Sequence, residues 1–119
     1  MNQRPRSITI ISWIFIVFGC IVLIASLLSI AHTPAAQRLP DFKTHWMVHV
    51  ARLAALVSGL FMLYGFNWAR CLLVAWLGFH VVIGLLHSKF ELAVHSVLFL
   101  VVVYFLFRPA AARFFRGEV

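Results

Sequence analysis

Long uncharged apolar segments alternate with short polar stretches along the chain. No charged residue occurs between Ile8 and Ile30. At about 1.5 Å per helical residue, this segment is long enough to cross the roughly 30 Å hydrocarbon core of a bilayer. A cleaved signal peptide would have a shorter apolar run, about 7–15 residues, followed by a small-x-small site. The segment therefore predicts a first membrane-spanning helix that is retained.

Three further apolar segments extend the same pattern toward the C-terminus. Pro34 and Pro40 predict a loop over residues 31–45, because proline disrupts the interior of a helix. Asp41 or Thr44 would then cap the second helix. The pattern predicts four transmembrane helices near residues 8–31, 45–66, 68–87 and 90–108.

Short turns and small residues determine how these helices are expected to pack. The turn from His87 to Phe90 is too short for anything but an antiparallel neighbour. Ser88 and Glu91 have the S-x-x-E spacing of a capping box. Ala55 and Gly59 form a small-xxx-small pair, which allows close helix contact. We expect residues 1–119 to form a single all-α domain, a membrane protein built as an antiparallel bundle of four transmembrane helices.

The composition agrees with a bilayer environment. Hydrophobic residues make up 64% of the chain and charged residues 11%, whereas soluble domains are about half apolar and about a quarter charged. The run VLFLVVVYFLF is rich in residues that favour strands in water. In a bilayer its backbone groups must bond internally, so we expect a helix.

The formal net charge of +7 is spread along the chain. The basic residues occur singly between apolar segments rather than along one polar face, which argues against nucleic acid as a partner. Basic residues favour the cytoplasmic side of a membrane, so we expect both termini to be cytoplasmic. Arg113 and Arg116 flank two phenylalanines in a short interfacial segment. The basic residues expected on the cytoplasmic side are Arg4, Arg6, Arg70, Arg108, Arg113 and Arg116.

His80 is the polar residue that the pattern explains least. It follows Arg70 by about 15 Å along a helix, which places it near mid-bilayer. Ionisable groups at that depth are rare and face the interior of a helix bundle. A neutral imidazole needs only a backbone carbonyl or a serine hydroxyl as its partner. A proton relay or a ligand site is the alternative interpretation.

A second polar group is expected at the membrane face opposite the termini. His45, His49 and Arg52 share one face of the second predicted helix. An arginine at mid-helix costs roughly 2.5–3.5 kcal/mol to insert, and less near the membrane edge. Glu91 is the only acidic residue on a helix at matching depth. We therefore predict an Arg52–Glu91 contact between the second and fourth helices.

Histidines around this predicted contact suggest a ligand or metal site as a further hypothesis. Imidazole and carboxylate groups suit zinc, iron or copper, although no spacing matches a recognised metal signature. The candidate metal ligands are His49, His87, Glu91 and His95, and the candidate intramembrane polar residues are His80, Arg52 and Glu91.

The stretches RPRSITIISWIFIVFG and GFNWARCLLVAW resemble a group of small bacterial integral membrane proteins with four apolar helices. These proteins tend to open with an RP-rich tail, here Arg4-Pro5. They carry a G-x-NWAR turn, here Gly65 with Asn67 to Arg70, and close with an FRP-like end, here Phe107 to Pro109. The resemblance implies the same fold and the bacterial inner membrane. It implies no catalytic residues, because the group has no established activity.

The sequence leaves three functional hypotheses open. It contains no GxGxxG, Walker, HExxH or nucleophile-elbow motif, so we expect no enzymatic activity and no catalytic residue. The first hypothesis is a membrane protein that acts by helix packing, as a homo-oligomer or with a larger membrane partner. The second is a transport or proton-conducting subunit that uses His80 and the outer polar residues. The third is a haem- or metal-binding redox subunit, although no cofactor is predicted from a motif.

Overall fold

The computed structural model describes residues 3–118, without the side chains of residues 39–42 and 44. The described residues contain helices and no strands, which confirms the all-α prediction. The helices are α1 (Arg6–His32), α2 (Ala35–Leu63), α3 (Asn67–His87), α4 (Lys89–Phe107) and α5 (Pro109–Arg116).

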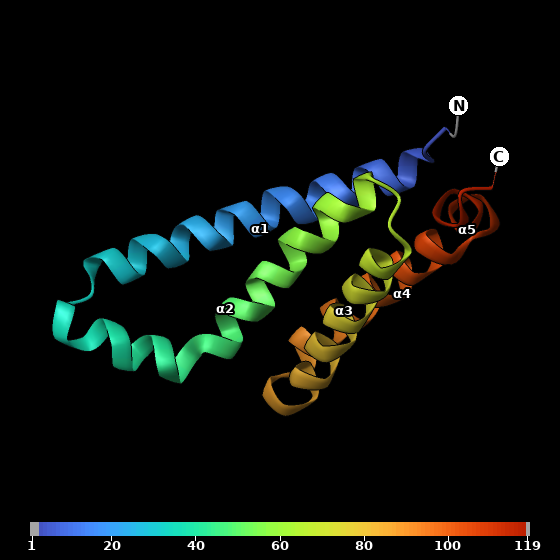
Figure 1. Ribbon diagram of the computed structural model, residues 1–119. Coiled ribbons are helices and arrows are strands. Elements are labelled where there is room, and N and C mark those ends of the chain that lie inside the picture. The colour runs from blue at the N-terminus through green and yellow to red at the C-terminus, as the bar shows by residue number, and fades with distance from the viewer. Residues whose placement is uncertain (1–2, 119) are drawn as a thin grey trace.

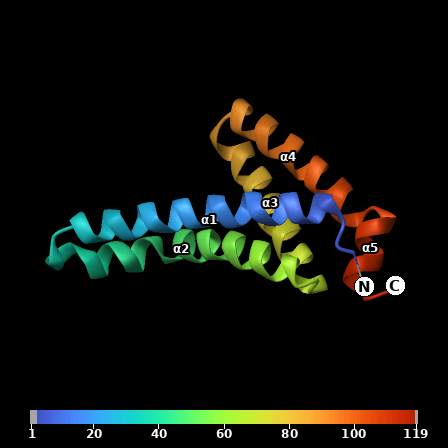
Figure 2. The ribbon, with the colours of Figure 1, turned by 90° about the horizontal axis from the view of Figure 1, so that it is seen from above.

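The long helices form two antiparallel hairpins, α1 with α2 and α3 with α4 (Figure 1). The hairpins meet mainly through α2 and α3, and α1 touches α4 much less. They separate away from the termini, as both views show (Figures 1 and 2). The prediction of four long antiparallel helices is thus confirmed, and the helices are arranged as two hairpins that spread apart away from the termini.

Four segments of the described chain are long and apolar enough to cross a membrane: Arg6–His32, His45–Leu63, Asn67–His87 and Lys89–Phe107. Little of their apolar surface is covered by other parts of the chain. Even in the best covered segment, on α3, 28% of the most apolar stretch is buried, and on α4 the share is 11%. Soluble proteins rarely leave apolar surface of this extent exposed, whereas lipid would cover it.

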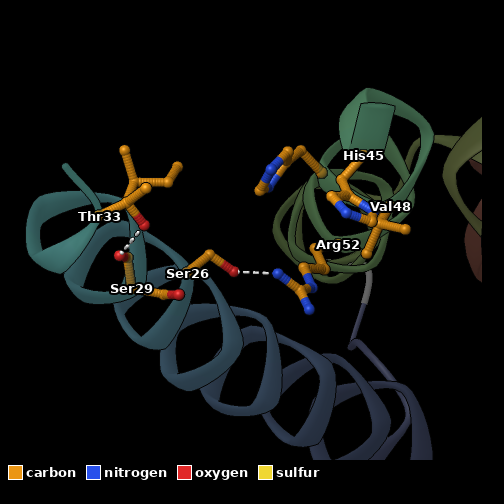
Figure 3. A pocket seen from close by; sticks show the side chains of 8 residues that line it. Ser26, Ser29, Thr33, His45, Val48 and Arg52 are labelled. Carbon is orange, nitrogen blue, oxygen red and sulfur yellow. Dashed lines mark hydrogen bonds between the residues drawn. The ribbon is translucent and has the colours of Figure 1, made fainter. Parts of the chain in front are cut away.

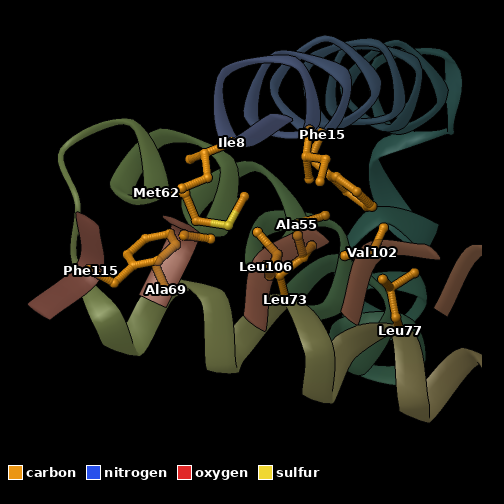
Figure 4. Packing of buried hydrophobic residues seen from close by; sticks show 12 residues of the cluster. Ile8, Phe15, Ala55, Met62, Ala69, Leu73, Leu77, Val102, Leu106 and Phe115 are labelled. Atoms are coloured by element: carbon orange, nitrogen blue, oxygen red, sulfur yellow. The ribbon is translucent and has the colours of Figure 1, made fainter. Parts of the chain in front are cut away.

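The hydrophobic core lies at the end of the molecule where the two hairpins meet (Figure 4). Ile8 of α1 and Met62 of α2 lie on one side of it, with Leu73 of α3 and Leu106 of α4 on the other. All four side chains are fully buried. Phe115 of α5 closes the core next to the termini.

Close contact between α1 and α2 depends on small residues, as the Ala55–Gly59 pair predicted. A Cβ atom on Gly59 would lie 2.9 Å from the carbonyl oxygen of Ser12. A Cβ atom on Gly19 would lie 2.8 Å from the Cβ of Leu56. These approaches leave no room for a larger side chain, so the glycines determine how near the two helices lie.

The predicted loop over residues 31–45 is wrong, because α2 begins at Ala35 and continues through position 40. A tight turn at Thr33 and Pro34 is sufficient to reverse the chain. Arg38 makes this turn possible by donating from Nε to the Thr33 carbonyl at 2.9 Å and from Nη2 to the Ala31 carbonyl at 3.2 Å. Carbonyls at the end of a helix need such partners.

The caps predicted for the second helix are wrong for the same reason. Pro34 is the N-cap of α2, so positions 41 and 44 lie inside the helix. The side chains of Asp41 and Thr44 lie outside the described part of the chain.

Other turns follow the sequence prediction. Gly65 has φ of 81°, a left-handed conformation that suits glycine after a helix. Ser88 caps α4, because its hydroxyl oxygen accepts a hydrogen bond from the Glu91 backbone N–H at 3.1 Å. Half of the predicted capping box is therefore present. The segment around Arg113 is a short helix, α5, which begins at Pro109.

Candidate functional site: two adjoining cavities beside Arg52

The arginines near the termini hold segments of the chain together through hydrogen bonds to carbonyl and hydroxyl oxygens. Arg4 donates to the Leu63 carbonyl at 2.8 Å, and Arg108 donates to the Ser7 hydroxyl at 2.9 Å. Arg70 retains only 9% of its exposure, donates to the Leu106 carbonyl at 3.2 Å and stacks on two phenylalanine rings. Arg70 therefore joins α3 to the end of α4 rather than lying at the surface.

A cavity of about 370 Å³ lies between α1 and α2 at the end opposite the termini, and we call it the hairpin cavity (Figure 3). Along one side of this cavity, Arg52 of α2 donates a hydrogen bond from Nη1 to the hydroxyl of Ser26 on α1. The Ser26 hydroxyl in turn donates to the Val22 carbonyl at 2.8 Å. The lining residues are Ser26, Ser29, Ile30, Thr33, His45, Val48, His49 and Arg52.

The sequence builds this cavity from two rows of residues at seven-residue spacing. Ser12, Gly19, Ser26 and Thr33 follow one another on α1. His45, Arg52 and Gly59 do the same on α2. Seven residues are close to two helical turns, so each row stays on one face. Where both rows are small the helices touch, and where α2 carries histidine and arginine they stand apart.

A second cavity of about 290 Å³ reaches α3 and α4, and we call it the histidine cavity. It shares Val48 and Arg52 with the hairpin cavity, so the two adjoin. His80 of α3 and His95 of α4 both line it, with ring centroids 5.6 Å apart.

Each of these imidazoles is fixed by the preceding turn of its own helix. Nδ1 of His80 lies 2.9 Å from the Trp76 carbonyl, and Nδ1 of His95 lies 2.8 Å from the Glu91 carbonyl. A carbonyl oxygen only accepts, so Nδ1 carries the proton and Nε2 of the neutral ring keeps its lone pair. His80 therefore has the backbone-carbonyl partner that the sequence analysis considered.

Trp76 is the residue of this site that sequence reasoning missed. Its indole N–H donates to the Ala51 carbonyl of α2 at 2.6 Å. Its ring lies 4.0 Å from the His80 ring and 5.9 Å from Phe15 of α1, measured between centroids. Trp76 thus joins α3 to both helices of the other hairpin. Its only sequence signal was the four-residue spacing to His80 on one helix face.

The predicted Arg52–Glu91 contact does not form. Arg52 takes a partner from its own hairpin, Ser26, while Glu91 stays exposed at the start of α4. The ion pair found among the described residues joins Arg116 and Glu118, outside the apolar segments, at 2.7 Å.

The candidate metal ligands are likewise divided among different places. His49 lines the hairpin cavity and His95 the histidine cavity. His87 and Glu91 are exposed around the α3–α4 turn, where Nδ1 of His87 lies 3.1 Å from the Ile83 carbonyl. Within residues 3–118, leaving aside the undescribed side chains, no group of three or more His, Cys, Asp and Glu side chains could hold a metal ion.

Comparison with known proteins found no matching family, curated protein or solved structure. The chemistry of the site therefore comes from its own residues. The hairpin cavity offers a permanent cation, hydroxyls and imidazoles, which suit an anion. The histidine cavity offers two neighbouring imidazoles, which suit proton exchange.

Proposed function

We propose that the protein is an integral protein of the bacterial inner membrane that crosses the bilayer four times. The four apolar helices and their uncovered surface support this placement. The two termini lie at one end of the molecule (Figures 1 and 2), as an even number of crossings requires. Five of the basic residues near that end belong to the terminal segments and favour the cytoplasm there: Arg4, Arg6, Arg108, Arg113 and Arg116.

Within the membrane, the protein acts without enzymatic chemistry as a proton-conducting or transport subunit. The observation that carries this proposal is that Arg52, His80 and His95 line one cavity. The two imidazole rings lie 5.6 Å apart, measured between centroids, and an imidazole can both accept and donate a proton. A chain of 119 residues encloses little on its own, so a complete path would require a second copy or a larger membrane partner.

Proton flux into liposomes tests this function. The purified protein is reconstituted with a pH-sensitive dye inside the vesicles, and a potassium gradient with valinomycin drives the protons. We expect flux above that of empty vesicles, lost in His80→Phe and in His95→Phe. His87→Phe is the matched control, because His87 is exposed and lines neither cavity. Wild-type flux equal to that of empty vesicles would reject proton conduction by this protein or its homo-oligomer.

Helix packing with a partner is the second candidate function. It is favoured by the carbonyl bonds of His80 and His95, since histidines satisfied by their own helices need no transported proton to explain them. Cross-linking in native membranes separates the two candidates. A stable cross-linked adduct, together with wild-type proton flux in His80→Phe and in His95→Phe, would favour packing alone.

A further inference from the structure

We infer that the hairpin cavity is a binding site for a phosphate-class anion, either inorganic phosphate or the phosphate of a lipid headgroup. The inference rests on the proposed membrane placement and does not require proton conduction. It is based on the charge of Arg52, on the neutral hydroxyl of Ser26 that Arg52 contacts, and on the depth of both residues in the membrane.

Arg52 carries a charge that the described lining of the cavity does not neutralise. Its described hydrogen bond goes to a neutral hydroxyl, that of Ser26, and uses one of the five N–H groups of the guanidinium. None of the residues described as lining the cavity is acidic. A partly buried charge without a counter-charge is costly, and a bound anion would remove that cost.

The chain has three acidic residues, and two of them lie elsewhere in the structure. Glu91 is exposed on the other hairpin, and Glu118 pairs with Arg116. Position 41 lies about 16 Å before Arg52 along the axis of α2, and its side chain lies outside the described part of the chain. An external anion is therefore the available counter-charge that the geometry favours.

The other lining groups suit an oxyanion. The guanidinium fork matches two oxygens of a phosphate. The hydroxyl of Ser29 and the imidazole of His45 face the same space and can donate to further oxygens. A volume of about 370 Å³ holds a phosphate group with several waters.

The depth of the site places it where such anions occur. Ser26 lies about 27 Å along α1 from Ile8, close to the roughly 30 Å thickness of the hydrocarbon core. The arginine side chain extends from α2 toward this level, as long cationic side chains do near a membrane interface. The cavity therefore lies at the boundary where headgroups and aqueous phosphate are both present.

The test has two arms, each with a defined probe. In the first, radiolabelled inorganic phosphate is titrated against delipidated protein in maltoside micelles, which contain no phosphate. In the second, phosphatidylglycerol is added to the same micelles and retained lipid is counted by native mass spectrometry. We expect saturable binding of one anion per chain in at least one arm. Phosphate binding alone identifies a free solute, and lipid retention alone identifies a headgroup.

Variants link the binding to the cavity. Arg52→Gln should weaken binding at least about tenfold, the effect of losing charge-assisted hydrogen bonds. Lys89→Gln is the matched control, because it removes an exposed cation from the same end of the other hairpin. Ser29→Leu fills the cavity without changing its charge. This second variant tests the site if Arg52→Gln fails to fold. No binding in either arm, or equal binding by Ser29→Leu and wild type, would overturn the inference. Failure of the membrane placement would show separately, in cysteine labelling of the termini.

Discussion

Arg52 of α2 and Ser26 of α1 form a hydrogen bond between the two helices of the first hairpin, beside the cavity that separates their far ends. The sequence had instead predicted a contact between Arg52 and Glu91 of the other hairpin. The hydrogen bond to Ser26 gives the guanidinium a neutral partner and leaves its charge available to the cavity.

A double-mutant cycle between Arg52 and Ser26 should therefore show coupling. We expect Arg52→Leu and Ser26→Ala to couple by about 0.5–2 kcal/mol, the range of hydrogen bonds between membrane helices. The free energy of unfolding in mixed micelles measures it. Arg52→Leu combined with Glu91→Leu is the control, and we expect those effects to add. Additive effects for Arg52 and Ser26 would show that the bond contributes nothing.

Gly59 of α2 should not accept a larger side chain without a loss of stability. Gly59→Ala places a methyl group 2.9 Å from the Ser12 carbonyl oxygen, so the helices must move apart. We expect a loss of about 1–3 kcal/mol in the free energy of unfolding, the usual cost of overpacking. Gly78→Ala is the control, since its Cβ would lie 3.6 Å from Phe99, an ordinary contact. Equal stability of both variants would contradict the close approach.

Trp76 should hold the two hairpins together through its indole N–H. Trp76→Phe keeps an aromatic ring beside His80 but removes the bond to the Ala51 carbonyl. We expect a loss of roughly 1 kcal/mol in the free energy of unfolding, with faster hydrogen exchange around position 51. Trp68→Phe is the comparison, because Trp68 is 47% exposed. If exchange near position 51 does not change, the bond does not protect this part of α2.

The pair at the end of α5 gives a prediction about pH. Glu118 accepts hydrogen bonds from Arg116 at 2.7 and 2.9 Å, and this bonding lowers the pKa of the carboxyl group. A lowered pKa means that the pair stabilises the helix end above the unfolded pKa and loses this effect as the pH falls through the folded value. Carbon-13 NMR of the Glu118 carboxyl should show its pKa rising in Arg116→Gln. An unchanged pKa would mean that the pair is not formed in solution.

The long helices were predictable because each follows from a local pattern. Uncharged length indicated α1, and the spacing of Ser88 and Glu91 indicated the start of α4. The extension of α2 to Ala35 was not predictable from proline content alone. Its turn depends on Arg38, whose side chain returns to the carbonyls of α1. This is a tertiary contact, and helix propensities cannot predict it.

Two residues of the candidate site could be identified from the sequence, but the residue that Arg52 contacts could not. Depth along the helices singled out Arg52 and His80 as polar residues, and both line the histidine cavity. Charge complementarity then suggested Glu91 for Arg52, because a sequence shows which residues share a depth but not which helices touch. The seven-residue spacing from Ser12 through Gly19 to Ser26 was the signal that could have identified the correct partner.

The orientation in the membrane is tested by single cysteines in a background that lacks the two native ones. Cys71 is exposed and Cys20 partly so, and both are first replaced by alanine. Gln3 and Gly117 lie near the termini, and Ser88 and Gln37 lie in or beside the turns at the opposite end. We expect a membrane-impermeant maleimide added to intact cells to label the cysteines at positions 37 and 88 and not those at 3 and 117, because both termini are proposed to be cytoplasmic.

Lysed cells provide the control for this labelling, since all four positions are exposed and should then react. Labelling of positions 3 and 117 in intact cells, with 37 and 88 protected, would keep the four crossings but invert the orientation. The hairpin cavity would then open to the cytoplasm. Labelling of positions 37 and 88 from opposite sides would reject the four crossings themselves, because each of these turns closes one hairpin at its end away from the termini.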